Sequence, residues 1–177
     1  MNTKLPSEFL DYMDKNIEYG YLGKNDKLYK YGDINFDVDW YDNYVLQSPN
    51  QLLITKCGNC FDQVEFERFW FLKNKYEVKT FFEMVNLDYT NNYPTHAFLI
   101  YKENEKWNLF ENADSDNKGI YTFDSVDELL DFQLNNYIKT LKKYNIKDEE
   151  IKKIVLKEFN DIKYNISAKE YIESVLS

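Results

Sequence analysis

The feature that most constrains the fold is a segment whose helical pattern is apolar over much of its circumference. This segment begins near Cys60 and ends at about Lys73. Its apolar side chains include Cys60, Val64, Phe66, Phe69, Trp70 and Phe71. A helix that is apolar on several sides is buried in the interior of a domain and does not lie on its surface. We therefore predict that this helix is central and that Cys60 lies at its buried N-terminus.

Strand patterns follow the central helix. Segments rich in aromatic and β-branched residues predict strands over 79–85, 97–101, 106–110 and 119–123. The polar tip Glu103-Asn104-Glu105 joins the second of these strands to the third as a hairpin. The segment from Lys27 to Tyr44 is aromatic and acidic and shows no clear period, so we interpret it as irregular.

Helix signals flank this region on both sides. Ser7 is a candidate cap for a first helix that ends at Gly20 and Gly23, and Ser48-Pro49 starts a short helix that Gly58 breaks. Further helices are predicted from Ser125 to about Tyr144, over 148–159, and after Ser167. The prediction is one α+β domain over 1–177, with a core at about 50–125 and C-terminal helices over about 125–177.

The composition narrows the class of partner. The 177 residues carry a formal net charge of −9, whereas nucleic acids and anionic membrane surfaces attract positive protein surfaces. No apolar run is long enough to cross a bilayer, and the first residues lack the apolar core of a signal peptide. We therefore expect a cytoplasmic protein that binds neither nucleic acid nor membrane. Its oligomeric state is left open.

Cys60 is a candidate nucleophile because of its expected place at a helix start. A thiol attacks as thiolate, which the positive end of a helix dipole and a nearby imidazolium both favour. Gly58 supplies a tight turn before it. The Cys60 amide has no acceptor within a helix, so it is also placed to donate into an oxyanion hole.

His96 is the chain's single histidine, so any Cys–His chemistry must use it. Pro94-Thr95 places it near the start of a strand. The residue that orients its ring should lie across the hairpin. A four-residue loop puts Glu111 opposite His96, and a three-residue loop puts Asn112 there. Both alternatives remain open at this stage.

Three motifs resemble those of the transglutaminase-like superfamily. They are Gly58-Asn59-Cys60-Phe61-Asp62, Thr95-His96-Ala97-Phe98 and Trp107 with Glu111 four residues later, and they cover about 50–125. The run from Phe110 to Ala113, followed by Gly119-Ile120, resembles a bacterial branch with glutamate in place of aspartate. The resemblance implies a papain-like core in which a central helix packs on an antiparallel sheet.

The resemblance also implies an activity. Cys60 would be the nucleophile, His96 the general base and acid, and Glu111 the orienting acid, with no metal and no organic cofactor. The reaction would be acyl transfer from a protein, peptide or other amide through a thioester. Resolution by water gives a peptidase or amidase, and resolution by an amine gives a transglutaminase.

Alternatives remain from other classes. Cys57-Gly58-Asn59-Cys60 is a C-x-x-C sequence before a helix, which occurs in thiol-disulfide oxidoreductases with the first cysteine as the attacking thiol. Two cysteines and the histidine would supply three zinc ligands, and an acidic fourth ligand would be unusual for a structural site. A binding or scaffold domain of the same fold without turnover is the third alternative.

Several further residues are candidates to build a cleft around the thiol. The aromatic candidates are Trp40, Tyr44, Trp70 and Tyr93, and the candidate oxyanion donors are Gln47 and Gln51. A core role is the alternative for each tryptophan.

Overall fold

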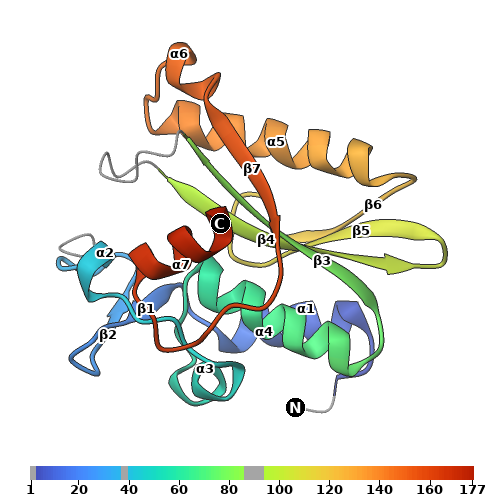
Figure 1. The fold of residues 1–177 in the computed structure, drawn as a ribbon. Coiled ribbons are helices and arrows are strands. Elements are labelled where there is room, and N and C mark those ends of the chain that lie inside the picture. The colour runs from blue at the N-terminus through green and yellow to red at the C-terminus, as the bar shows by residue number, and fades with distance from the viewer. Residues whose placement is uncertain (1–2, 37–39, 86–93) are drawn as a thin grey trace.

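The computed structural model describes residues 3–36, 40–85 and 94–177. Within these residues the chain has an α+β fold with seven helices, a two-stranded sheet and a five-stranded antiparallel sheet (Figure 1). The order in the larger sheet is β6-β5-β4-β3-β7. The elements are α1 (Pro6–Asn16), β1 (Gly20–Leu22), β2 (Leu28–Lys30), α2 (Trp40–Asn43), α3 (Pro49–Thr55), α4 (Cys60–Lys73), β3 (Glu77–Val85), β4 (Thr95–Glu103), β5 (Lys106–Glu111), β6 (Gly119–Phe123), α5 (Val126–Lys143), α6 (Asp148–Ile151), β7 (Ile154–Phe159) and α7 (Ala168–Leu176).

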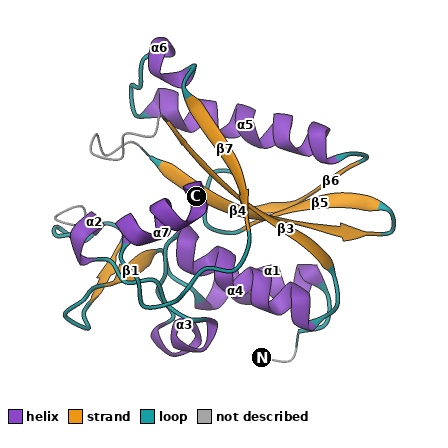
Figure 2. Ribbon diagram, viewed as in Figure 1, coloured by secondary structure: helices purple, strands orange, loops and turns teal. Residues whose placement is uncertain are grey.

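Helices cover both faces of the five-stranded sheet. Helix α4 packs on β3 and β4, with α1 beside it, and α5 lies across the opposite face (Figure 2). Side chains alternate between these faces along β4. Ala97 and Leu99 join the large cluster around α4, whereas Phe98 and Ile100 join the smaller one beneath α5. The predicted central helix is confirmed, with the predicted bounds.

Local signals explain several of the elements. Ser48 accepts a hydrogen bond from the Gln51 amide and caps α3, and Ser125 and Ser167 cap α5 and α7 in the same way. The four predicted strands are present as β3, β4, β5 and β6. Short-range patterns were therefore sufficient for most of the sheet and for the helices that begin with a serine cap.

The predicted helix over 148–159 is wrong. Its first residues form the four-residue helix α6, and Ile154–Phe159 forms strand β7, which pairs with β3. Helical spacing of apolar residues favoured a helix there. Pairing with β3 supplies the backbone of that strand with hydrogen-bond partners along an otherwise open edge, and this long-range contact overrides the local pattern.

Smaller corrections concern the first helices. Helix α1 begins at Pro6 with Leu5 at the cap position, so Ser7 lies inside its first turn. Gly20 starts β1 and does not end the helix. Helix α3 ends at Thr55, and the residue that follows it, Lys56, adopts the left-handed conformation with φ 54°, before Gly58 is reached. The segment expected to be irregular contains β2 and α2.

Both hairpin registers considered for β4 and β5 are also wrong. Glu103 pairs with Lys106 across a two-residue turn, Asn104-Glu105, and Leu99 pairs with Phe110. Both turn residues have positive φ, 50° and 61°, as a type I′ turn requires. The twist of such a turn matches that of the strands, which explains why the shorter connection is adopted.

Candidate functional site

The start of α4 is held by a reciprocal cap. Asn59 Oδ1 accepts hydrogen bonds from the Phe61 and Asp62 amides, while Asp62 Oδ2 accepts one from the Asn59 amide. Cys60 is the first residue of the helix that this cap defines. Among the described residues the Cys60 amide meets no hydrogen-bond acceptor, as is usual for the first N–H groups of a helix.

Asp62 also ties this helix start to the chain that precedes it. Its Oδ1 accepts hydrogen bonds from the Gln47 amide at 2.8 Å and from the Tyr44 hydroxyl at 3.0 Å. Burial raises the pKa of Asp62 to about 7, although these hydrogen bonds act against the increase. One buried carboxyl group therefore fixes both the helix cap and the segment before α3.

A second set of backbone contacts brings Tyr19 to the thiol. The Glu18 amide donates to the Lys56 carbonyl, and the Gly58 amide donates to the Glu18 carbonyl. A Cβ at Gly20 would lie 2.4 Å from Cys57 Sγ, so this close approach requires glycine. Tyr19 lies between Glu18 and Gly20, and both of these residues contact the segment from Lys56 to Gly58. The Tyr19 side chain is therefore placed beside the N-terminus of α4.

His96 and Glu111 are in direct contact. His96 Nε2 lies 2.7 Å from Glu111 Oε2, and the other Glu111 oxygen accepts a hydrogen bond from the Asp114 amide at 2.8 Å. Asn112 makes a different contact, in which its Nδ2 donates to Gln63 Oε1 at 2.7 Å. Gln63 in turn donates to the Gly58 carbonyl. Glu111 therefore contacts the imidazole, while Asn112 braces the turn before Cys60.

The electrostatics connect His96 to the thiol. Burial alone would lower the pKa of His96, but the charge of Glu111 and hydrogen bonds with Cys60 and Glu111 raise this pKa well above its ordinary value. The Cys60 thiol itself donates to the Thr95 carbonyl oxygen, with Sγ at 4.0 Å from it, next to His96 in the chain. Burial, together with the charge of Cys60 and a hydrogen bond to it, raises the pKa of Tyr19. The thiol thus has an imidazole and a phenol as neighbours.

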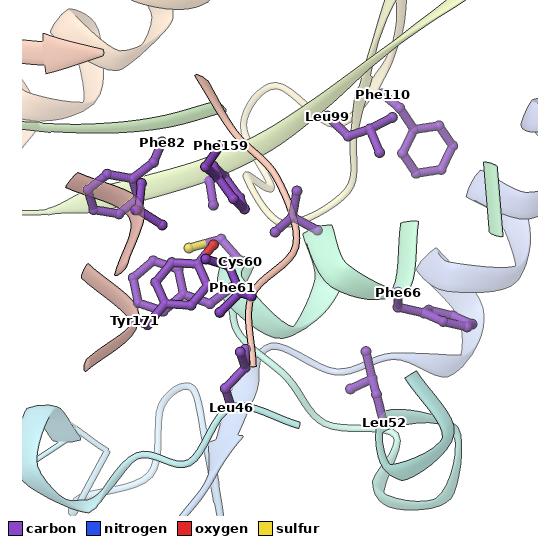
Figure 3. Packing of buried hydrophobic residues seen from close by; sticks show 14 of the residues in the cluster. Leu46, Leu52, Cys60, Phe61, Phe66, Phe82, Leu99, Phe110, Phe159 and Tyr171 are labelled. Atoms are coloured by element: carbon purple, nitrogen blue, oxygen red, sulfur yellow. The ribbon is translucent and has the colours of Figure 1, made fainter. Parts of the chain in front are cut away.

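Cys60 itself is well covered. Its residue is 4% exposed, and it belongs to the large hydrophobic cluster with Phe61, Phe82 and Tyr171 (Figure 3). A pocket of about 460 Å³ is lined by His96 and Tyr19 but not by Cys60. The thiol therefore lies behind these two side chains as seen from the pocket.

Two buried carboxyl groups near His96 were missed by the sequence analysis. Glu83 pairs with His96 across β3 and β4, and burial raises its pKa to about 8. Burial also raises the pKa of Glu67, which interacts with Glu111 and Cys60. Each interrupts an otherwise apolar pattern, in a helix for Glu67 and in a strand for Glu83, and that interruption was a usable signal. Tyr19 gave no comparable signal.

The remaining cleft candidates are placed elsewhere. Trp70 is buried and stacks on Phe9, and Tyr44 is buried against Asp62. Both amide atoms of Gln47 are hydrogen bonded, to Thr55 and to the Cys57 carbonyl. None of these residues, nor Trp40 or Gln51, lines the pocket, and Tyr93 lies outside the described residues.

Cys57 differs from Cys60 in its surroundings. It is 1% exposed, and burial raises its pKa to about 11. Helix α3 precedes it where a thioredoxin-like unit would have a strand. An attacking thiol needs an accessible, stabilised thiolate, so these features do not favour Cys57 in that role. Over residues 3–36, 40–85 and 94–177, no group of three or more His, Cys, Asp and Glu side chains is arranged to hold a metal ion.

Comparison with known protein families and with curated proteins finds no match. No described helix is long and apolar enough to cross a membrane.

Proposed function

We propose that this chain is a cysteine-dependent acyl-transfer enzyme acting on amides, with Cys60 as nucleophile, His96 as general base and acid, and Glu111 as the orienting acid. The observation that carries the proposal is the 2.7 Å contact of His96 Nε2 with Glu111 Oε2, beside a cysteine that starts a central helix. In this arrangement Glu111 fixes the ring and stabilises the imidazolium, as the third member of a triad does.

The reaction would run in two halves. Cys60 gives its proton to His96, and Sγ attacks the carbonyl carbon of the amide. The C–N bond then breaks, and His96 returns the proton to the leaving amine, which leaves a thioester on Cys60. Water or a second amine attacks the thioester and gives a proton to His96 as the C–S bond breaks. The Cys60 amide, at the positive end of α4, is placed to stabilise the oxyanion in both halves.

The transglutaminase-like resemblance supports the same assignment. The order cysteine, histidine, acid along the chain agrees with that superfamily, and a central helix packed on an antiparallel sheet is compatible with its core. We propose membership of this superfamily as the explanation of the three motifs. That chemistry needs no metal and no organic cofactor, so the residues named above would carry all of its steps.

The first test is selective alkylation of the thiol. Iodoacetamide at about pH 6 reacts with a thiolate that an imidazolium stabilises and spares an ordinary thiol. We expect labelling of the wild type and of Cys57→Ala and none of Cys60→Ala. Mass spectrometry identifies the modified residue. Labelling that persists in Cys60→Ala, or that requires Cys57, would overturn the assignment.

The second test concerns turnover. An amide library is incubated with and without an amine acceptor, and hydrolysis and amine incorporation are both measured beside Cys60→Ala. Product with water alone identifies a peptidase or amidase, and amine-dependent product identifies a transglutaminase. Turnover that survives in Cys60→Ala would show that another group performs the chemistry.

A binding domain without turnover is a second candidate function, favoured by one observation. Cys60 is 4% exposed and does not line the pocket, whereas Tyr19 and His96 do. Under this alternative the pocket binds a ligand and the thiol serves packing. An unlabelled Cys60 in the folded wild type, with full labelling after denaturation, would support this alternative.

A further inference from the structure

The pocket beside His96 has a chemical character of its own. It encloses about 460 Å³, and it lies against α5, which contributes Gln133 and Tyr137 to its wall. Glu83 and His96 enter it from the paired strands β3 and β4, and Tyr19 comes from the segment before β1. The triad proposed above uses only His96 among these side chains, so the rest of the lining is unexplained.

Two buried polar side chains of the pocket lining, Glu83 and Gln133, contact each other. Glu83 is 1% exposed, and its Oε1 accepts a hydrogen bond from Gln133 Nε2 at 2.8 Å. Gln133 is 3% exposed, and its Oε1 finds no partner among the described residues. A buried acceptor without a donor is costly, so the pocket lining beside Gln133 favours a ligand with N–H donors.

The charges and rings around the pocket favour a cation. Asp114 and Asp116 line it, and the lysine among the lining residues, Lys143, is paired with Asp116 at 2.5 Å. Tyrosine rings also line it, and ammonium groups are attracted to such rings. These are Tyr19, Tyr31, Tyr137 and Tyr144.

We propose that this pocket binds an aliphatic ammonium group, with Glu83 and Gln133 as its acceptors. The assignment to the amine side of the reaction rests on the proposed function. The pocket is lined by His96, which protonates a leaving amine and deprotonates an incoming one, and not by Cys60. The cation therefore belongs to the amine component, either as a basic residue on the leaving side of the amide or as the second ammonium group of a diamine acceptor.

Binding of a cation should depend on pH in a defined direction. Burial raises the pKa of Glu83 to about 8, so its carboxyl group is mainly protonated at neutral pH. A cation binds the ionised form, so its affinity increases as pH rises towards about 8 and then levels off. The groups that face Glu83 are His96, Glu111, Asp114 and Tyr137. The charges of His96 and Glu111 largely offset each other as a pair.

The test is a binding measurement that needs no turnover. Calorimetry on Cys60→Ala compares 1,5-diaminopentane with pentane-1,5-diol, which has the same length and no charge. We expect measurable binding of the diamine only, and at least about tenfold weaker binding after Glu83→Gln, because one ionised acceptor is lost. Asp131→Asn, an exposed carboxylate on α5, is the matched control and should leave binding unchanged.

The outcomes separate this proposal from the acyl-transfer proposal. Equal binding of diamine and diol, or diamine binding that Glu83→Gln leaves intact, would overturn the ammonium site. If circular dichroism shows that Glu83→Gln is not folded, the ammonium site is tested by the pH dependence of diamine binding to Cys60→Ala. A diamine affinity that does not change between about pH 6 and 8 would overturn the site.

A comparison of substrates shows whether the cation is a basic residue on the leaving side of the amide or the second ammonium group of a diamine acceptor. Amides with lysine after the scissile bond are compared with norleucine analogues, and diamine incorporation is compared with that of pentylamine. A preference for lysine identifies the leaving side, and a preference for the diamine identifies the acceptor side. If the diamine binds but Cys60 is never alkylated, the ammonium site is supported. The assignment of this site to the amine component of an acyl-transfer reaction is then overturned.

Discussion

Glu111 contacts His96 diagonally across the β4–β5 pair and not from the position directly opposite. The register pairs Leu99 with Phe110, and continuing it by one residue places Glu111 beside Phe98. Diagonal neighbours have Cβ atoms about 7–8 Å apart, a gap that a long side chain can span. The 2.7 Å contact with His96 Nε2 is made in this way, which gives a physical reason for glutamate at this position.

Shortening this side chain should therefore break the contact. We expect Glu111→Asp and Glu111→Gln both to lower the pKa of His96, the first by distance and the second by loss of charge. As the chain has one histidine, its imidazole proton signal in NMR can be followed by pH titration without assignment. Asp127→Asn, an exposed acidic residue at the start of α5 that does not line the pocket, is the control. An unchanged His96 titration in both variants would show that Glu111 does not set this pKa.

Removal of the Tyr19 ring should uncover the thiol. Tyr19 and His96 line the pocket and Cys60 lies behind them, so Tyr19→Ala is expected to increase the alkylation rate of Cys60 about tenfold. Tyr19→Phe keeps the ring and should change the rate much less. Time-resolved mass spectrometry measures both rates. Equal rates in the wild type and in Tyr19→Ala would mean that the ring does not limit access.

Asp62 should be a strong determinant of stability. Its carboxyl group accepts hydrogen bonds from the Asn59 and Gln47 amides and the Tyr44 hydroxyl, all at buried atoms. Asp62→Ala leaves these donors unpaired and should lower the free energy of unfolding by about 3 kcal/mol or more. Urea denaturation measures the loss. Asp127→Ala, an exposed residue in the first turn of α5, should cost less than about 1 kcal/mol.

Stability should fall as the pH rises from about 5 to 8. The folded-state pKa of His96 is raised, so its contribution is fully present below its unfolded pKa and is lost as the pH rises through the folded value. Asp62 and Glu83, with pKa values of about 7 and about 8, also hold protons in the folded state that the unfolded chain releases near pH 4. All three effects have the same sign.

Calorimetry at a series of pH values checks this expectation. The midpoint temperature of thermal unfolding should decrease by several degrees between about pH 5 and 8. In Glu83→Gln the decline between about pH 5 and 8 should be shallower throughout, because one of the groups that hold a proton only in the folded state is gone. A midpoint that increases over this range would contradict the raised pKa values.

The turn between β4 and β5 offers a stabilising substitution. Glu105 adopts φ 61°, a left-handed conformation that costs a residue with a side chain about 1–2 kcal/mol, and glycine relieves about 0.5–1 kcal/mol of this once its larger loss of entropy on folding is subtracted. Glu105→Gly should increase the free energy of unfolding by that amount, less a small loss from the exposed ion pair with Lys102. Glu105→Gln removes the same charge without changing the backbone and is the control. A lower stability of Glu105→Gly than of Glu105→Gln would contradict the interpretation.

The sequence by itself determined the elements whose signals are local. Asn59 and Asp62 cap α4 through contacts three residues apart, and the apolar circumference of that helix makes a central position unavoidable. Local signals likewise predicted α5 and strands β3 to β6. They also identified Cys60, His96 and the hairpin residue Glu111 as candidates for a site. These signals are readable because each depends on residues close together in the chain.

The tertiary structure decided whatever depends on contacts between distant segments. Strand β7 forms because β3 offers it an edge, and Tyr19 reaches the thiol because the backbone of Glu18 is hydrogen bonded to Lys56 and Gly58. The choice of Glu111 over Asn112 followed from a register that turn geometry and strand twist set together. Burial of Glu83 beside His96 likewise required the sheet and α5 to be in place. Such contacts are stabilised only in the assembled fold, and no local pattern encodes them.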